Sequence, residues 1–165
     1  MSDSIKKAVQ KGEILQKTGE LNSKVYYVKS GLLRSYTIDD NGREHIFMFA
    51  PEGWVIADNQ GPEIPTELYI DALEDSFVIV RSKIITDDSP HVGSLIKRIG
   101  VLQKRILMMM SKSAIERYQH FVDTYPDILQ RVPQRMVASY LGVTPETLSA
   151  AKTTWRKKFR EKPNS

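Results

Sequence analysis

The segment "VTPETLSAAKTTWRKKF", residues 143–159, carries side chains that can read DNA bases. Glu146 can accept a hydrogen bond from cytosine N4 in the major groove, and Ser149 can contact several bases. At helical spacing these polar residues fall on one side of a helix and the apolar residues fall on the other. The predicted polar side comprises Glu146, Ser149, Ala150, Thr153 and Lys157, and the predicted inward stripe comprises Leu148, Ala151, Trp155 and Phe159.

Basic residues flank this predicted helix at positions suited to contacts with DNA phosphates, namely Arg135, Lys152, Arg156 and Lys158. The full set of predicted DNA contacts is Gln134, Arg135, Thr144, Pro145, Glu146, Thr147, Ser149, Ala150, Lys152, Thr153, Arg156 and Lys157. The alternative interpretation is a small helical hairpin whose charged edge is simply solvated.

A tight turn is predicted immediately before this helix. Gly142 is a typical residue to end the preceding helix, Thr144 is a preferred N-cap, and Pro145 suits a first helical position. Ala138, four residues before Gly142, is small enough for two helices to cross, and Leu148, six residues after it, can lock the second helix. The combination is typical of a helix-turn-helix.

The charge of the chain is unevenly distributed. Residues 131–165 hold eight Lys or Arg and two Glu, whereas the rest of the chain is slightly acidic within a net charge of +4. A basic end on a mildly acidic body is expected of a tethered nucleic-acid contact, and a solvated basic tail is the alternative.

The composition excludes several functional classes. The 165 residues include no cysteine, which excludes disulfides, thiolate zinc sites, cysteine-ligated iron–sulfur clusters and cysteine nucleophiles. An enzyme on a cupin-like roll would need clustered His and Glu ligands, but the three histidines are His45, His91 and His120, and the last two fall outside the predicted strands. We therefore expect no enzyme, metal or cofactor. The absence of a signal peptide and of an apolar run of about 18 residues predicts a cytoplasmic protein.

Residues 13–86 are predicted to form strands. Short β-branched and aromatic runs such as "VYYV" (25–28), "WVIA" (54–57), "LYIDAL" (68–73) and "FVIVRS" (77–82) alternate with turns that contain Gly or Pro. The runs "LLRSYTI" and "EHIFMFA" flank "DDNGR", whose Asn-Gly pair predicts a hairpin. This spacing favours an antiparallel sandwich or roll.

A long helix is predicted to begin around residue 94. Its apolar residues follow a heptad seam of Leu95, Ile99, Leu102, Ile106 and Met109. Further apolar residues widen this surface, so the seam is expected to meet a second copy of the chain while a flank packs on the roll. A helix buried only on its own domain is the alternative. A second helix is predicted over residues 112–125.

These features resemble the Crp/Fnr-type bacterial transcription regulators. The resemblance rests on "GE" at 19–20, "YYVKSGLLRSY" at 26–36, "DNGREH" at 40–45 and "RVPQRMVASYLGVTPETLS" at 131–149. It implies an α+β fold: an antiparallel, jelly-roll-like β-roll of the cyclic-nucleotide-binding type, a long dimerisation helix and a helix-turn-helix. The implied boundaries are 1–93 for the roll, 94–115 for the dimerisation helix and hinge, and 116–165 for the DNA-binding domain.

The sequence also departs from the pattern of this family. Where the family pairs an acidic residue with Arg-Ser or Arg-Thr on a cyclic nucleotide, we place Asp58, Thr66 and Glu67 as candidate ligand residues. Glu67 would repel the phosphate, so ordinary binding of cyclic AMP is not expected. Ala150 stands where the family often carries a base-reading arginine, which predicts altered or relaxed specificity. The family's amino-terminal helical segment and its β-wing are expected to be mostly absent.

The expected function is that of a homodimeric, sequence-specific regulator on a palindromic DNA operator with half-sites about 10 base pairs apart. A change in the long-helix seam would reset the spacing of the two recognition helices. RNA polymerase and an unidentified small-molecule effector are further candidate partners, and no membrane association is expected. The alternative is a small-molecule-binding β-roll with a degenerate helical tail that reads no DNA.

Overall fold

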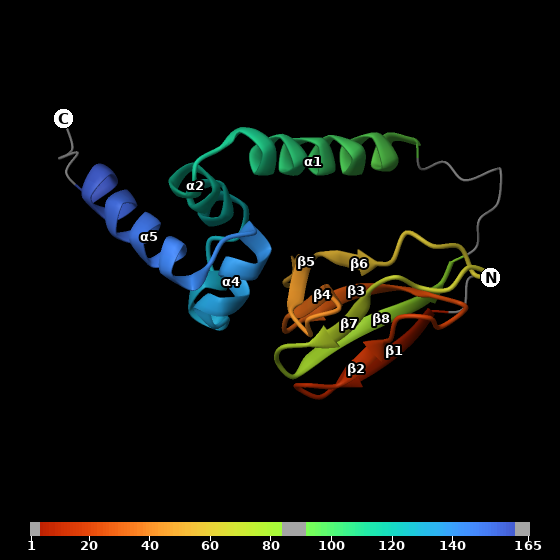
Figure 1. Cartoon of the computed structure of the whole chain (residues 1–165). Helices are drawn as coiled ribbons and strands as arrows, with labels where there is room; N and C mark the ends of the chain where they lie inside the picture. The colour runs from red at the N-terminus through yellow and green to blue at the C-terminus, as the bar shows by residue number, and fades with distance from the viewer. Residues whose placement is uncertain (1–3, 84–91, 161–165) are drawn as a thin grey trace. The chain divides into compact units, whose positions relative to one another are not determined.

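The computed structural model describes residues 4–83 and 92–160, with side chains at 4–83, 100–110 and 112–158. The chain forms two compact units, Met1–Asp87 and Asp88–Ser165. The first consists of strands and the second of helices (Figure 1). Among the described residues, no helix combines the length and apolar character required to cross a membrane.

The first unit is an antiparallel β-roll of two four-stranded sheets with orders β1-β8-β3-β6 and β2-β7-β4-β5. The predicted antiparallel roll is thus confirmed. Its strands are β1 (Ser4–Val9), β2 (Ile14–Gln16), β3 (Lys24–Ser30), β4 (Leu33–Ile38), β5 (Glu44–Ala50), β6 (Val55–Ala57), β7 (Tyr69–Ala72) and β8 (Ser76–Ser82).

Strand β1 was missed because the predicted strand region began at residue 13. Val9 is its single buried residue, so the local sequence shows no alternation of buried and exposed side chains. Pairing with β8 over its whole length, from Ser4 opposite Arg81 to Val9 opposite Ser76, places the segment in the sheet. A long-range partner therefore decides this element.

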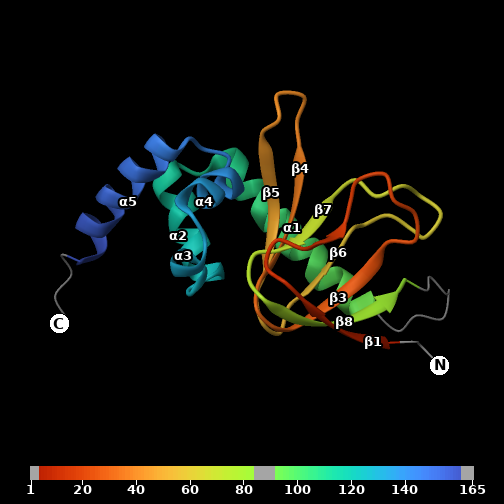
Figure 2. The ribbon, with the colours of Figure 1, turned by 90° about the horizontal axis from the view of Figure 1, so that it is seen from below.

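The predicted hairpin around Asn41-Gly42 is confirmed as β4–β5, which projects from the roll in Figure 2. Gly42 has a φ of +74°. The Asp39 carboxylate accepts hydrogen bonds from the backbone N–H groups of Asn41 and Arg43, both at 2.9 Å. His45 is exposed, and its Nε2 atom lies 2.8 Å from the same carboxylate.

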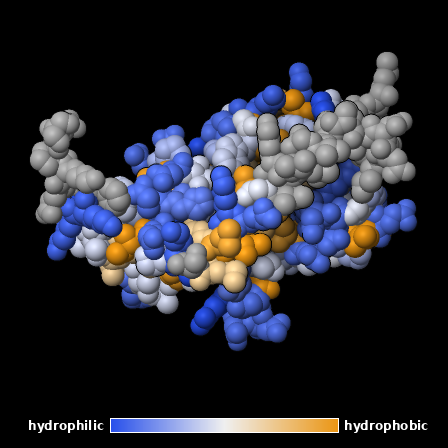
Figure 3. All heavy atoms as spheres, turned by 90° about the horizontal axis from the view of Figure 1, so that it is seen from above, coloured by the Kyte–Doolittle hydropathy of each residue, from blue (hydrophilic) through white to orange (hydrophobic). Residues whose placement is uncertain are grey.

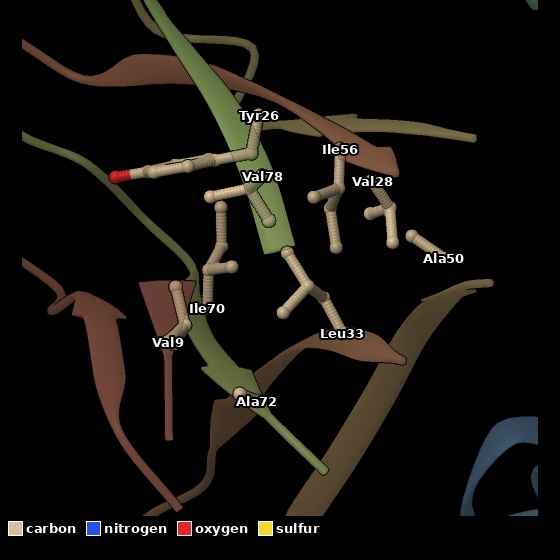
Figure 4. Packing of buried hydrophobic residues seen from close by; sticks show 9 residues of the cluster. All are labelled: Val9, Tyr26, Val28, Leu33, Ala50, Ile56, Ile70, Ala72 and Val78. Atoms are coloured by element: carbon tan, nitrogen blue, oxygen red, sulfur yellow. The ribbon is translucent and has the colours of Figure 1, made fainter. Parts of the chain in front are cut away.

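The core of the roll lies between the two sheets. Figure 4 shows the apolar side chains of both sheets directed toward one another. The buried cluster consists of Val9, Tyr26, Val28, Leu33, Ala50, Ile56, Ile70, Ala72 and Val78.

The second unit contains five helices in its described part: α1 (Val92–Ser111), α2 (Ala114–Thr124), α3 (Ile128–Arg131), α4 (Gln134–Leu141) and α5 (Pro145–Arg160). The start of α2 is fixed by a capping box between Ser113 and Glu116, whose hydrogen bonds lower the pKa of Glu116 to about 2. Phe121 of α2 packs on Tyr140 of α4 with ring centroids 5.3 Å apart, and Tyr125 packs on both. These rings hold α2 against α4.

Candidate nucleic-acid interface

The turn between α4 and α5 has the geometry that its sequence predicts. Gly142 adopts φ 64° and ψ 36°, the left-handed conformation of a helix C-cap. The N–H of Val143 donates to the carbonyl of Ala138 at 3.1 Å, which closes the end of α4. Pro133 is the N-cap of α4.

The start of α5 is capped as predicted. The Thr144 hydroxyl accepts a hydrogen bond from the backbone N–H of Thr147 at 3.2 Å. Pro145 is the first residue of the helix. The pKa of Glu146 is lowered because its carboxylate accepts a hydrogen bond from its own backbone N–H and another from the Thr144 hydroxyl. The Glu146 carboxylate is therefore ionised at neutral pH and acts as a hydrogen-bond acceptor.

The inward side of α5 is held by α2. Leu148 and Ala151 are buried. Trp155 packs edge-on against Tyr118, with centroids 5.5 Å apart and an interplanar angle of 84°, and its indole N–H donates to the Gln119 amide oxygen. The predicted apolar stripe is confirmed for these residues. The fourth member, Phe159, lies outside the described side chains.

The other side of α5 faces away from the helical core. All twelve predicted DNA contacts are exposed except Lys152, which is partly buried. Burial, and secondarily the charge of Arg156, lowers the pKa of Lys152. The structure thus places the predicted base-reading and phosphate-contacting residues on an accessible surface around α5 and the start of α4.

Two arginines that were not predicted from the sequence donate hydrogen bonds to the end of α4, next to the turn before α5. Arg117 of α2 donates to the carbonyl of Leu141 at 3.2 Å and to the carbonyl of Met109. The Arg105 guanidinium lies 4.2 Å from the centroid of the Tyr140 ring and donates to the Tyr140 carbonyl at 3.4 Å. Both satisfy carbonyls at the end of α4, and no local spacing signals such long-range partners.

Replacing Thr144 with alanine is expected to lower the unfolding free energy of the helical unit by about 1 kcal/mol, because the N–H of Thr147 loses its cap. Urea unfolding followed by Trp155 fluorescence, in a Trp54→Phe background, measures this change. Thr154→Ala is the matched control, since the Thr154 hydroxyl bonds the Ala150 carbonyl within the helix and should be dispensable. Equal losses in both variants would contradict the capping role.

The predicted dimer seam is partly described. Leu95 and Ile99 lie outside the described side chains. Leu102 is partly buried, Ile106 is 57% exposed and Met109 is 38% exposed. Other apolar residues of α1 are exposed as well, namely Val101, Leu107 and Met110. Figure 3 shows exposed apolar side chains, in orange, among hydrophilic ones on the face that it displays.

The candidate ligand residues lie near one another on the loop between β6 and β7, but two of them are buried and hydrogen-bonded within the roll. The buried Asp58 carboxylate accepts from the backbone N–H groups of Glu67, Leu68 and Gln60, each at 2.9 Å. The buried Thr66 hydroxyl donates to the Lys17 carbonyl at 2.6 Å. Glu67 is exposed.

The loop also receives hydrogen bonds from Lys83, which directly follows β8, and from Ser23. The Lys83 ammonium donates to the carbonyls of Asp58 and Gln60, the latter at 2.8 Å. The Ser23 hydroxyl donates to the same Gln60 carbonyl at 3.1 Å. Protein groups therefore satisfy the polar atoms that hold this loop in place.

Comparison with known proteins agrees with this architecture. The model of the cyclic nucleotide-binding domain matches residues 6–81. The chain is 30% identical over 169 residues to the fumarate and nitrate reduction regulatory protein of Vibrio cholerae, covering 87% of this chain and 66% of that protein. It is 27% identical to the anaerobic regulatory protein of Haemophilus influenzae, covering 87% and 64%. The chain thus spans just under two thirds of the length of these curated relatives.

Solved structures share the fold. FixK2 from Bradyrhizobium japonicum superposes with a TM-score of 0.71 at 22% identity, covering 96% of this chain and 86% of that one. A crp/fnr-family transcriptional regulator from Eubacterium rectale, described as putative, gives 0.68 at 19% identity, covering 98% and 82%. The roll and the helical unit together define a protein of the class that joins a cyclic nucleotide-binding-type domain to a helical unit. The chain belongs to the Crp/Fnr-type family of bacterial transcription regulators.

Proposed function

We propose that this chain is a sequence-specific DNA-binding transcription regulator that acts as a homodimer and places α5 in the major groove. The observation that carries the proposal is the division of α5 into two sides. Leu148 and Ala151 are buried, whereas Glu146, Ser149 and Ala150 are exposed and lie beside exposed basic residues. A helix anchored on one side and polar on the other fits the role of a recognition helix.

The phosphate contacts in this proposal come from Arg135, Lys152, Arg156 and Lys158. Arg135 is the second residue of α4 and the other three lie on α5, so both helices carry cations for such contacts. Such contacts position a protein on DNA and make its affinity depend on salt.

The homodimer is supported by the apolar surface of α1. Val101, Ile106, Leu107 and Met110 are each more than half exposed, which is unusual for so many large apolar residues on one helix. Pairing of two α1 helices would cover part of this surface and relate the two α5 helices by two-fold symmetry. A palindromic operator would then match that symmetry.

The roll is proposed not to bind cyclic AMP in the usual way. The Asp58 carboxylate is buried and already accepts three backbone N–H groups, so it is engaged in holding the loop. Glu67 adds a negative charge where the phosphate would lie, and Thr66 offers no cation. The proposal is therefore supported by a loop whose acidic residue Asp58 hydrogen-bonds to the loop backbone.

Selection of duplexes from a random pool at about 0.15 M salt tests the DNA-binding function. We expect enrichment of a palindrome with half-sites about one turn, or 10 base pairs, apart. The Arg135→Ala variant should bind all enriched sequences more weakly and reduce the slope of log affinity against log salt by about 1. Arg43→Ala, in the exposed loop of hairpin β4–β5, is the control and should change neither. An unenriched pool with salt-sensitive binding would contradict sequence-specific reading and favour the ligand-binding alternative.

A further inference from the structure

The exposed side of α5 is chemically unusual for a surface proposed to read DNA. Between Glu146 in the first turn and Arg156 near the end, its exposed residues are all small: Thr147, Ser149, Ala150, Thr153 and Thr154. Two side chains in this interval, Lys152 and Trp155, carry nitrogen donors, but neither is fully exposed. Lys152 is partly buried, and the Trp155 indole N–H donates to Gln119.

The threonine hydroxyls are committed to the helix. The Thr153 hydroxyl donates to the Ser149 carbonyl and the Thr154 hydroxyl to the Ala150 carbonyl, both at 3.1 Å. A threonine whose hydroxyl bonds back to the preceding turn has its χ1 angle restricted, so its methyl group also takes a defined direction. The middle of α5 thus offers the methyl groups of Ala150 and Thr153 as ordered contact points.

The exposed side chains of α5 limit which bases the helix can recognise. A specific contact to guanine uses Arg or Lys on O6 and N7, and a bidentate contact to adenine uses Asn or Gln. The exposed residues from Thr147 to Thr154 include none of these types. Alanine and threonine methyl groups instead make apolar contact with the 5-methyl group of thymine. The ionised Glu146 carboxylate is a hydrogen-bond acceptor and suits the N4 amino group of cytosine.

Resting on the proposed function, in which Glu146 contacts a cytosine, we propose that Ala150 and Thr153 read thymine methyl groups in each half-site. The three residues are spaced 4 and 3 positions apart and therefore share one stripe of the helix. At about 1.5 Å per residue they span roughly 10 Å, which corresponds to about three base-pair steps. Thymine methyl recognition by Ala150 thus replaces the guanine recognition that an arginine would provide.

Replacement of thymine by uracil tests this inference, because uracil keeps every hydrogen bond of thymine and loses the methyl group. Once a palindrome has been selected, each thymine of a half-site is replaced in turn and binding is measured by titration. We expect an affinity loss of roughly fourfold at each thymine that contacts Ala150 or Thr153, from the removal of one buried methyl group. Thymines elsewhere in the half-site should tolerate the replacement.

The Ala150→Arg variant identifies which base faces residue 150. It should change the preference at one position of each half-site from thymine to guanine and abolish the effect of uracil there. Ala8→Arg, on the exposed edge strand β1, is the matched control and adds the same charge without a change of preference. Failure to enrich a palindrome overturns the proposed function and this inference with it. An enriched palindrome that tolerates uracil throughout, or that carries guanine opposite Ala150, overturns this inference alone.

Discussion

Replacing Gly31 with alanine is expected to lower the unfolding free energy of the roll by about 3–5 kcal/mol, the combined cost of backbone strain and overpacking. Gly31 lies in the turn between β3 and β4 with a φ of +88°. A Cβ atom there would lie 2.2 Å from the Ser76 hydroxyl oxygen, 2.6 Å from the Asp75 carbonyl oxygen and 2.7 Å from the Ser76 Cα. Two of these three atoms are backbone, so the start of β8 would have to move.

That movement would also break local hydrogen bonds. The Ser76 hydroxyl accepts from the N–H of Leu32 at 3.2 Å and donates to the Glu74 carbonyl at 2.7 Å. The turn after β3 and the start of β8 are therefore held to each other through one side chain. A methyl group at position 31 would separate them.

Gly53→Ala separates the two contributions to this loss. Gly53 has nearly the same φ, +83°, but a Cβ atom there meets nothing within 4 Å. It should cost only the conformational strain, about 1–2 kcal/mol. Urea unfolding of the roll, followed by Trp54 in a Trp155→Phe background, measures both variants. Equal losses of unfolding free energy in the two variants would show that the close approach of β8 to Gly31 does not contribute to the loss.

Removing the Asp71 carboxylate, as Asp71→Ala, is expected to destabilise the roll by about 3 kcal/mol because it leaves a buried guanidinium without its main partner. Asp71 on β7 lies directly opposite Arg34 on β4. Two parallel hydrogen bonds join them, Nε to Oδ1 at 2.9 Å and Nη2 to Oδ2 at 3.0 Å, and both side chains are nearly buried. Burial opposes the charge of Arg34, but the hydrogen bonds and charges of Asp71 and Glu44 outweigh it and raise the pKa of Arg34.

Two further variants test the cause of this loss. Glu44 also pairs with Arg34, but its side chain is 43% exposed, so Glu44→Ala should cost less than about 1 kcal/mol. Replacing the whole pair, as Arg34→Met with Asp71→Leu, should recover most of the stability lost by Asp71→Ala. The same urea titration with Trp54 as the probe measures these variants. A double variant as unstable as Asp71→Ala would contradict the role of the unpaired charge.

These predictions bear on function through the rigidity of the roll. The loop between β6 and β7, which holds Asp58, Thr66 and Glu67, joins strands of the two sheets. Arg34–Asp71 stabilises β7 at one end of that loop, and hydrogen bonds to Lys83 secure the other. These contacts therefore hold both ends of the loop within the roll.

The local chemistry of the chain predicted the turn between α4 and α5. A left-handed helix end requires a residue such as Gly142, and the caps of α5 depend on Thr144 and Pro145, which lie within a few residues of one another. The two sides of α5 were likewise predictable. Helical periodicity alone places Leu148 on the side opposite Glu146, and Ala151 on the side opposite Ser149. The hairpin at Gly42 follows from the same kind of short-range signal.

Tertiary structure decided the features whose partners are far away in the chain. β1 carries no alternating pattern and becomes a strand through β8, and the Asp58 carboxylate is engaged by N–H groups up to ten residues away. Arg117 reaches the end of α4, 24 residues later, although its own surroundings in sequence indicate only a helix. Periodicity and capping act over one or two turns of chain, so the sequence alone predicts α5 and the turn before it. Which buried polar groups remain available for a ligand depends on contacts that form only when distant segments meet.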